Sequence, residues 1–115
     1  GGFFYNDNGH YEKKADFIAD NINIVLATFL SQITSTKDPI TFVGDASILY
    51  KNLITESASV FENVEFCDNN TQNGVSLTKC AYSNFKNGKI GDSNMLSPLY
   101  LRASQAEQAL KNNKL

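Results

Sequence analysis

The chain opens with two short segments that contain aromatic residues, separated by a polar turn signal. Phe3-Phe4-Tyr5 and His10-Tyr11-Glu12 stand on either side of the pair Asn8-Gly9. Asn-Gly is a preferred pair for a tight turn between antiparallel strands. We therefore predict a β-hairpin, and we expect its second strand to continue through Ala15 and Phe17.

After Phe17 the hydrophobic period lengthens toward 3.6. Apolar residues then recur every three or four positions, at Ile18, Ile22, Val25, Leu26, Phe29, Leu30 and Ile33. This spacing predicts an amphipathic helix. Asp16 and Asp20 both suit its first turn, and we place the start at Asp20 because this leaves Phe17 in the strand. Lys37-Asp38-Pro39 ends the helix.

Two short apolar runs follow, with a helical pattern between them. Residues 40–43 are β-branched and aromatic, which is typical of a strand buried on both faces, and Gly44 punctuates this run. The spacing predicts a helix over residues 47–59 and another short strand over residues 64–66.

The last third of the chain contains a polar loop, a third helix and an unusual ending. Residues 68–74 are polar, and Leu77, Ala81 and Phe85 then recur at helical spacing. Asn87-Gly88 and Gly91-Asp92 form a connector. Pro98 opens the extended run Pro98-Leu99-Tyr100-Leu101, and Ser104 with Glu107 matches a capping box. We predict an arm and a helix from about residue 97 to 113.

This element order predicts the fold class. A hairpin followed by helix, strand, helix, strand and helix favours one α/β domain over residues 1–115, with a mixed sheet that opens with the hairpin and is flanked by helices. The two cysteines, Cys67 and Cys80, are too few for a disulfide framework. We expect both to be packed free thiols in a reducing cytosol.

Composition and spacing argue against several kinds of function. Ten basic and twelve acidic residues give a net charge of −2. This charge argues against a domain that binds nucleic acid without the help of a partner protein. No apolar run approaches the length of a membrane span. The single histidine, His10, has no partner at metal-ligand spacing, and no nucleophile motif is present. We expect neither catalytic residues nor a metal site.

The ending resembles the C-terminal signature of the TsaB family, the glycoprotease-like proteins of tRNA threonylcarbamoyladenosine biosynthesis. The matching run is Pro98-Leu99-Tyr100-Leu101-Arg102, followed by Ala106-Glu107. Residues 40–46 with Tyr50 are similar to the family's strand, Gly-Asp turn and helix. The opening Gly1-Gly2-Phe3-Phe4-Tyr5 resembles the family's strand after its Asp-Ala-Arg-Arg element, which is absent here. A plain extended arm that leads into a terminal helix also explains the ending.

The resemblance implies a fold and a function. The fold is one ribonuclease-H-like half of the actin, sugar kinase and Hsp70 superfamily, so the chain would be the second half of a two-domain cytoplasmic protein. The function is that of a non-catalytic scaffold without a cofactor. It pairs with the catalytic paralogue TsaD, recruits the ATPase TsaE, forms a possible homodimer through the first half, and meets tRNA only indirectly.

The same resemblance implies roles for individual residues. Gly44 and Asp45 match a turn that approaches a nucleotide in the superfamily, although Ala46 replaces a second glycine, so we do not predict ATP binding. Pro98, Tyr100, Arg102 and Glu107 are candidates for structural or partner contacts. Two other functions stay open: a glycoprotease-like peptidase, and half of a sugar or acetate kinase.

Overall fold

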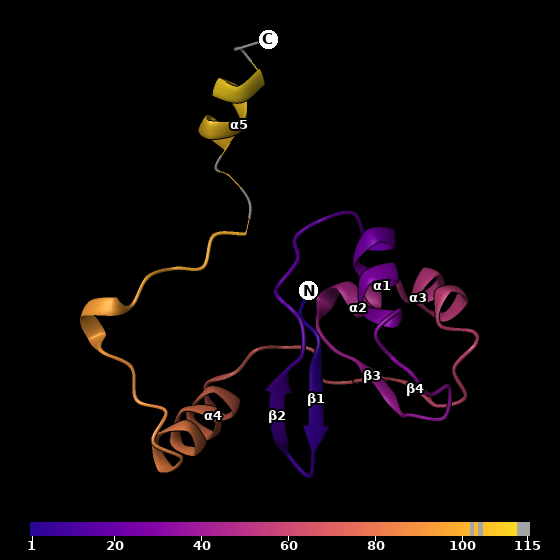
Figure 1. Cartoon of the computed structure of the whole chain (residues 1–115), viewed down its shortest axis with the longest axis horizontal. Coiled ribbons are helices and arrows are strands. Elements are labelled where there is room, and N and C mark those ends of the chain that lie inside the picture. The colour runs from indigo at the N-terminus through magenta and orange to yellow at the C-terminus, as the bar shows by residue number, and fades with distance from the viewer. Residues whose placement is uncertain (102, 104, 113–115) are drawn as a thin grey trace. The chain divides into compact units, whose positions relative to one another are not determined.

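The computed structural model in Figure 1 describes residues 1–101, 103 and 105–112. Helices and short strands alternate along the chain, so the predicted α/β class is confirmed at this coarse level. Residue contacts divide the chain into two compact units. The first contains Gly1–Ile33 together with Pro98–Leu115, and the second contains Thr34–Ser97.

The first unit opens with the predicted hairpin. Strand β1 (Phe4–Asp7) pairs antiparallel with β2 (His10–Lys13). Asn8 and Gly9 both have positive φ, at 49° and 87°. Two successive positive φ angles are what a two-residue type I′ turn requires, and Asn-Gly accepts them at low cost. The hairpin prediction is therefore confirmed.

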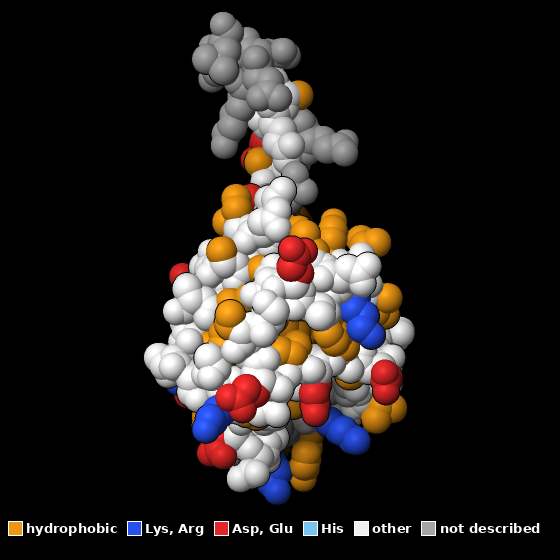
Figure 2. All heavy atoms as spheres, turned by 90° about the vertical axis from the view of Figure 1, so that its right-hand side faces the viewer, with side chains coloured by type: hydrophobic (Ala, Val, Ile, Leu, Met, Phe, Trp, Pro, Cys, Tyr) orange, Lys and Arg blue, Asp and Glu red, His pale blue; other side chains and the backbone are white. Residues whose placement is uncertain are grey.

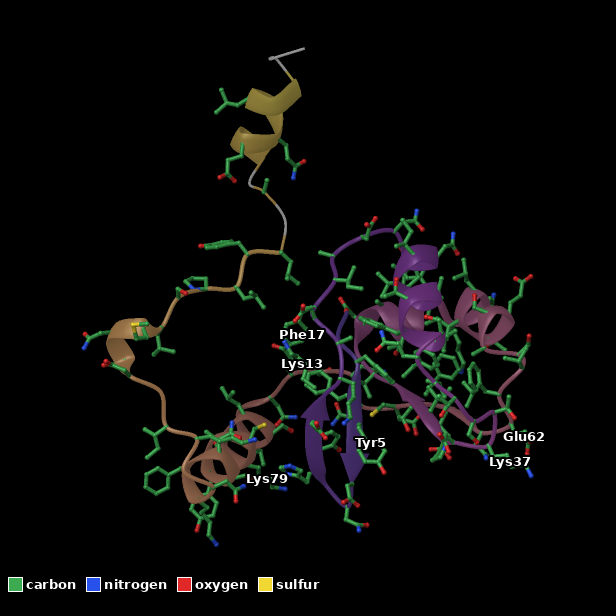
Figure 3. All side chains as sticks on the ribbon, viewed as in Figure 1. Tyr5, Lys13, Phe17, Lys37, Glu62 and Lys79 are labelled. Atoms are coloured by element: carbon green, nitrogen blue, oxygen red, sulfur yellow. The ribbon has the colours of Figure 1, made fainter. Side chains whose placement is uncertain are left out.

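The predicted continuation of β2 through Ala15 and Phe17 is wrong. The strand ends at Lys13, and the chain then turns so that the Phe17 ring lies 6.0 Å from the Phe4 ring. Figure 3 shows Lys13 and Phe17 next to each other, and the Lys13 ammonium lies 5.2 Å from the Phe17 ring centroid. Phe17 thus packs against the hairpin beyond the end of β2, and Gly1 and Ile18 exchange two backbone hydrogen bonds, at 2.6 and 2.9 Å, past this point.

Helix α1 (Ile22–Leu30) is the predicted amphipathic helix, with shifted ends. Asn21 caps it by accepting a hydrogen bond from the Asn23 amide at 3.0 Å, so the cap is one residue later than Asp20. Leu26 is buried, and the Phe29 ring stacks on Phe3 at 6.0 Å. The helix stops before Ile33.

The early stop of α1 has a local cause. The Ser31 hydroxyl and the Gln32 side-chain amide both donate to the Thr28 carbonyl, at 3.0 and 3.1 Å. Polar side chains that bond backbone carbonyls in this way compete with continuation of the helix.

The second unit is built on two parallel strands. Strand β3 (Ile40–Phe42) pairs with β4 (Val64–Phe66) in the register Ile40↔Val64. The prediction that these strands join the hairpin in one sheet is wrong, because β1–β2 and β3–β4 form two separate two-stranded sheets. Each strand pairs only with the other strand of its own two-stranded sheet.

Two helices connect the parallel strands. The predicted single helix over residues 47–59 is divided into α2 (Asp45–Leu49) and α3 (Lys51–Ser57). The division falls at Tyr50, whose φ of −107° and ψ of 21° leave the helical region. Ile54 and Ala58 are buried beneath these helices.

The third predicted helix is confirmed as α4 (Gly74–Lys86), which Asn73 caps by accepting a hydrogen bond from the Ser76 amide at 2.9 Å. Every residue of α4 is exposed, so the prediction that Cys80 is packed is wrong; Cys67 is half-buried. A short 3₁₀ turn, η1 (Ser93–Met95), follows.

The arm and terminal helix belong to the first unit. Pro98, Leu99, Tyr100 and Leu101 form neither helix nor strand, and the helix α5 spans Gln105–Asn112. Arg102 and Ser104 lie outside the described residues, so the predicted capping box does as well.

Buried side chains are few in the part of the chain that the structure describes. They are Leu26 in the first unit, and Ser47, Ile54 and Ala58 in the second. Figure 2 accordingly shows hydrophobic side chains open on the face it presents, among acidic and basic ones.

Candidate functional site

A candidate site lies where β3 and β4 end. In parallel sheets the carboxyl ends of neighbouring strands point the same way, and ligands of α/β proteins commonly bind beyond them. The rings of Phe42 and Phe66 stack across the two strands with centroids 5.6 Å apart. The Cys67 amide donates to the Phe42 carbonyl at 2.9 Å, which extends the pairing by one residue.

Gly44 forms the turn between β3 and α2. Its φ of 98° and ψ of 168° define a conformation that is nearly exclusive to glycine. The Ser47 hydroxyl and amide both donate to the Gly44 carbonyl, at 2.6 and 3.1 Å. Ser47 is only 4% exposed, so its hydroxyl is satisfied within the fold.

Asn70 joins the two strand ends. Its Oδ1 accepts a hydrogen bond from the Gly44 amide at 2.6 Å, and its Nδ2 donates to the Cys67 carbonyl at 2.5 Å. Both bonds are partly buried. One side-chain amide therefore fixes the β3–α2 turn and the loop after β4 in a single arrangement.

A small hollow opens beside this arrangement. It has a volume of about 160 Å³ and is lined by Ser47, Ile48, Lys51, Phe66, Cys67, Asp68 and Asn70. Pockets for drug-sized ligands usually occupy roughly 300–1,000 Å³. The hollow is thus too small to enclose a nucleotide.

The hollow carries both charges and a thiol. The Lys51 ammonium lies 5.1 Å from the centroid of the Phe66 ring, a cation–π distance. The Cys67 thiol donates to the Asn69 carbonyl at 3.3 Å. Lys51 and Asp68 are exposed, so water competes for both charges. This chemistry suits recognition of a small polar group.

The residues predicted from the sequence fall in different places. Gly44 forms the turn as expected, whereas Asp45 is exposed, accepts a hydrogen bond from the Ala46 amide at 2.9 Å and does not line the hollow. Pro98 and Tyr100 are exposed and belong to the other unit, as does Glu107 in α5.

Asn70 was missed from the sequence. Its residue type gave one signal, because asparagines in polar loops commonly bond nearby backbone groups. Its partner Gly44 lies 26 residues earlier, however, and no local pattern connects the two.

The described residues also lack two other kinds of feature. No three His, Cys, Asp or Glu side chains gather there in a way that could hold a metal ion. No helix of that part is both long and apolar enough to cross a membrane.

Comparison with known proteins adds no relative. No family profile, characterised protein or solved structure matches this chain.

Proposed function

We propose that this chain is the second half of a non-catalytic, cytoplasmic scaffold subunit of the TsaB kind, which supports synthesis of threonylcarbamoyladenosine at position 37 of ANN-decoding tRNAs. The observation that carries the proposal is the run from Pro98 to Arg102 followed by Ala106-Glu107. In this proposal the chemistry belongs to TsaD, and TsaE joins as a further partner.

The local geometry supports the proposal at two points. An opening hairpin, followed by parallel strands that helices connect, is compatible with a half of the actin, sugar kinase and Hsp70 superfamily. The segment that resembles the family's Gly-Asp turn is a strand, a glycine with positive φ and a helix start, in that order. The structure has two small sheets, and the assignment to this superfamily fold is part of the proposal.

Reconstitution of the modification tests the proposal. The longer protein that carries this chain as its second half is mixed with TsaD, TsaE, tRNA and the synthase that supplies threonylcarbamoyl-adenylate. Modified adenosine should form with the longer protein present and not when it is omitted. Normal modification without it would contradict the scaffold assignment.

Two variants sharpen this test. The 115-residue chain alone should fail to replace the longer protein, because the resemblance assigns the main subunit contact to the first half. Arg102→Ala in the longer protein should lower its melting temperature more than it lowers turnover, since we propose that Arg102 fixes the arm. A loss of turnover at unchanged melting temperature would make Arg102 a partner contact instead.

A further inference from the structure

Helix α4 presents an apolar side that nothing in its own unit covers. At helical spacing, one side of the helix carries Val75, Leu77, Thr78, Ala81, Tyr82 and Phe85. The large side chains are widely open, with Leu77 73%, Phe85 65% and Tyr82 62% exposed. Exposed contiguous apolar surface of this kind marks an interaction site.

The charge around α4 has one sign. Residues 69–91 contain Lys79, Lys86 and Lys89 and no aspartate or glutamate. Lys79 is labelled on α4 in Figure 3, and the Lys86 ammonium lies 5.6 Å from the Tyr82 ring centroid. A surface that suits α4 must therefore be both apolar and acidic.

The β3–β4 part of the same unit has that chemistry. Residues 34–68 contain six acidic residues against two lysines. Exposed apolar side chains stand at the carboxyl ends of the strands and in α2, where Val43, Ile48 and Leu49 are 68%, 63% and 76% exposed. Asp45 and Asp68 are exposed in the same region.

Asn70 limits how α4 can meet the surface of its own chain. Its two hydrogen bonds hold the loop to Gly44 and Cys67, and only Thr71, Gln72 and Asn73 remain before the helix begins. Three residues span at most about 10 Å, whereas the helix itself is about 20 Å long. A second copy of the chain has no such restriction.

We propose that two copies of this chain associate reciprocally, with α4 of each copy docked on the surface formed by Val43, Asp45, Ile48, Leu49 and Asp68 of the other. Each copy offers both halves of the contact, so a two-fold arrangement makes the same contact twice and closes the pair. Apolar side chains supply the buried surface, and the lysines meet the acidic residues at its rim. The inference does not depend on the proposed function.

Sedimentation of the 115-residue chain tests the association. The mass should rise with concentration from 12.7 kDa toward twice that value. Phe85→Glu should weaken the dimer at least about tenfold, because it places a charge in the centre of the apolar side. Ser83→Glu makes the same charge change on the polar side of α4 and should weaken it far less, and circular dichroism should show equal helix content in both variants. A chain that stays monomeric, or equal effects of the two variants, would overturn the proposal.

The two cysteines distinguish docking between copies from docking within one chain. Cys67 lines the hollow beside the proposed surface, and Cys80 is exposed on α4. A Cys67→Ser chain is mixed with a Cys80→Ser chain and treated with a short bis-maleimide. A covalent dimer that links Cys80 of one chain to Cys67 of the other is the expected product. If the native chain instead links Cys67 to Cys80 within a monomer, and the mixture gives no such dimer, α4 docks on its own chain and the proposal fails.

Discussion

Gly44 and Asn70 show how single residues position the strand ends. The Gly44 backbone supplies a conformation that other residues resist, and the Asn70 side chain bonds the amide that this conformation exposes. The sequence predicted that Gly44 ends the apolar run over residues 40–43. The need for a positive φ was not visible, because it arises from the direction in which α2 leaves the sheet.

At the residue scale, Gly44→Ala should destabilise the second unit. A side chain at φ 98° is strained even where space is free, and such strain costs about 1–3 kcal/mol. Urea denaturation followed by circular dichroism measures the loss. Gly74→Ala is the matched control: its Cβ also meets open space, its φ is not positive, and it lies at the start of α4. The control should be neutral or stabilising by up to about 1 kcal/mol, and equal losses in the two variants would contradict the role given to Gly44.

At the scale of elements, sequence periodicity predicted the kinds of element better than their ends. The hairpin, α1 and α4 lie close to where the pattern predicted them, since each depends on local signals such as Asn8-Gly9 or apolar residues at helical spacing. The pairing of strands was not predictable in the same way. Nothing between residues 13 and 40 indicates that the hairpin and β3 stay in separate sheets, because pairing depends on contacts distant in sequence.

The division of the second predicted helix at Tyr50 also depends on packing that the local sequence does not reveal. Residues 47–59 have a continuous helical pattern, yet the chain bends so that Ile54 becomes 2% exposed and Ala58 1% exposed. Burial of these two side chains decides the direction of α3. Periodicity alone contains no information about which turn of a helix must bend to reach its core.

Ile54→Ala tests how much α3 contributes. Truncation of a buried isoleucine costs about 2–5 kcal/mol, because buried contacts are lost and a cavity remains. We expect a loss at the lower end in urea denaturation, since few neighbours of Ile54 are themselves buried. Val60→Ala, at a side chain that is 66% exposed and lies outside the proposed docking surface, should change stability by less than about 0.5 kcal/mol. If both variants unfolded alike, Ile54 would not be the centre of this unit.

At the scale of the molecule, the small hollow argues against nucleotide binding by this chain alone. Its volume of about 160 Å³ cannot enclose adenosine, and Lys51 stands over Phe66 rather than over a phosphate-binding turn. Isothermal titration of the 115-residue chain with ATP and magnesium should give no binding heat. A nucleotide-binding protein titrated in the same buffer is the positive control. Micromolar binding would show that the Gly44 turn receives a nucleotide after all.

Every strand in the described part of the chain is an edge strand, because both sheets have only two strands. Unpaired backbone groups along such edges can recruit strands of other molecules, which is the first step toward fibrous aggregation. Two features oppose this step: β3 and β4 are three residues long, and the charged residues Glu12, Lys13 and Lys14 stand at the end of the hairpin. Protection against such aggregation would therefore come from short strands and charged side chains rather than from a closed sheet.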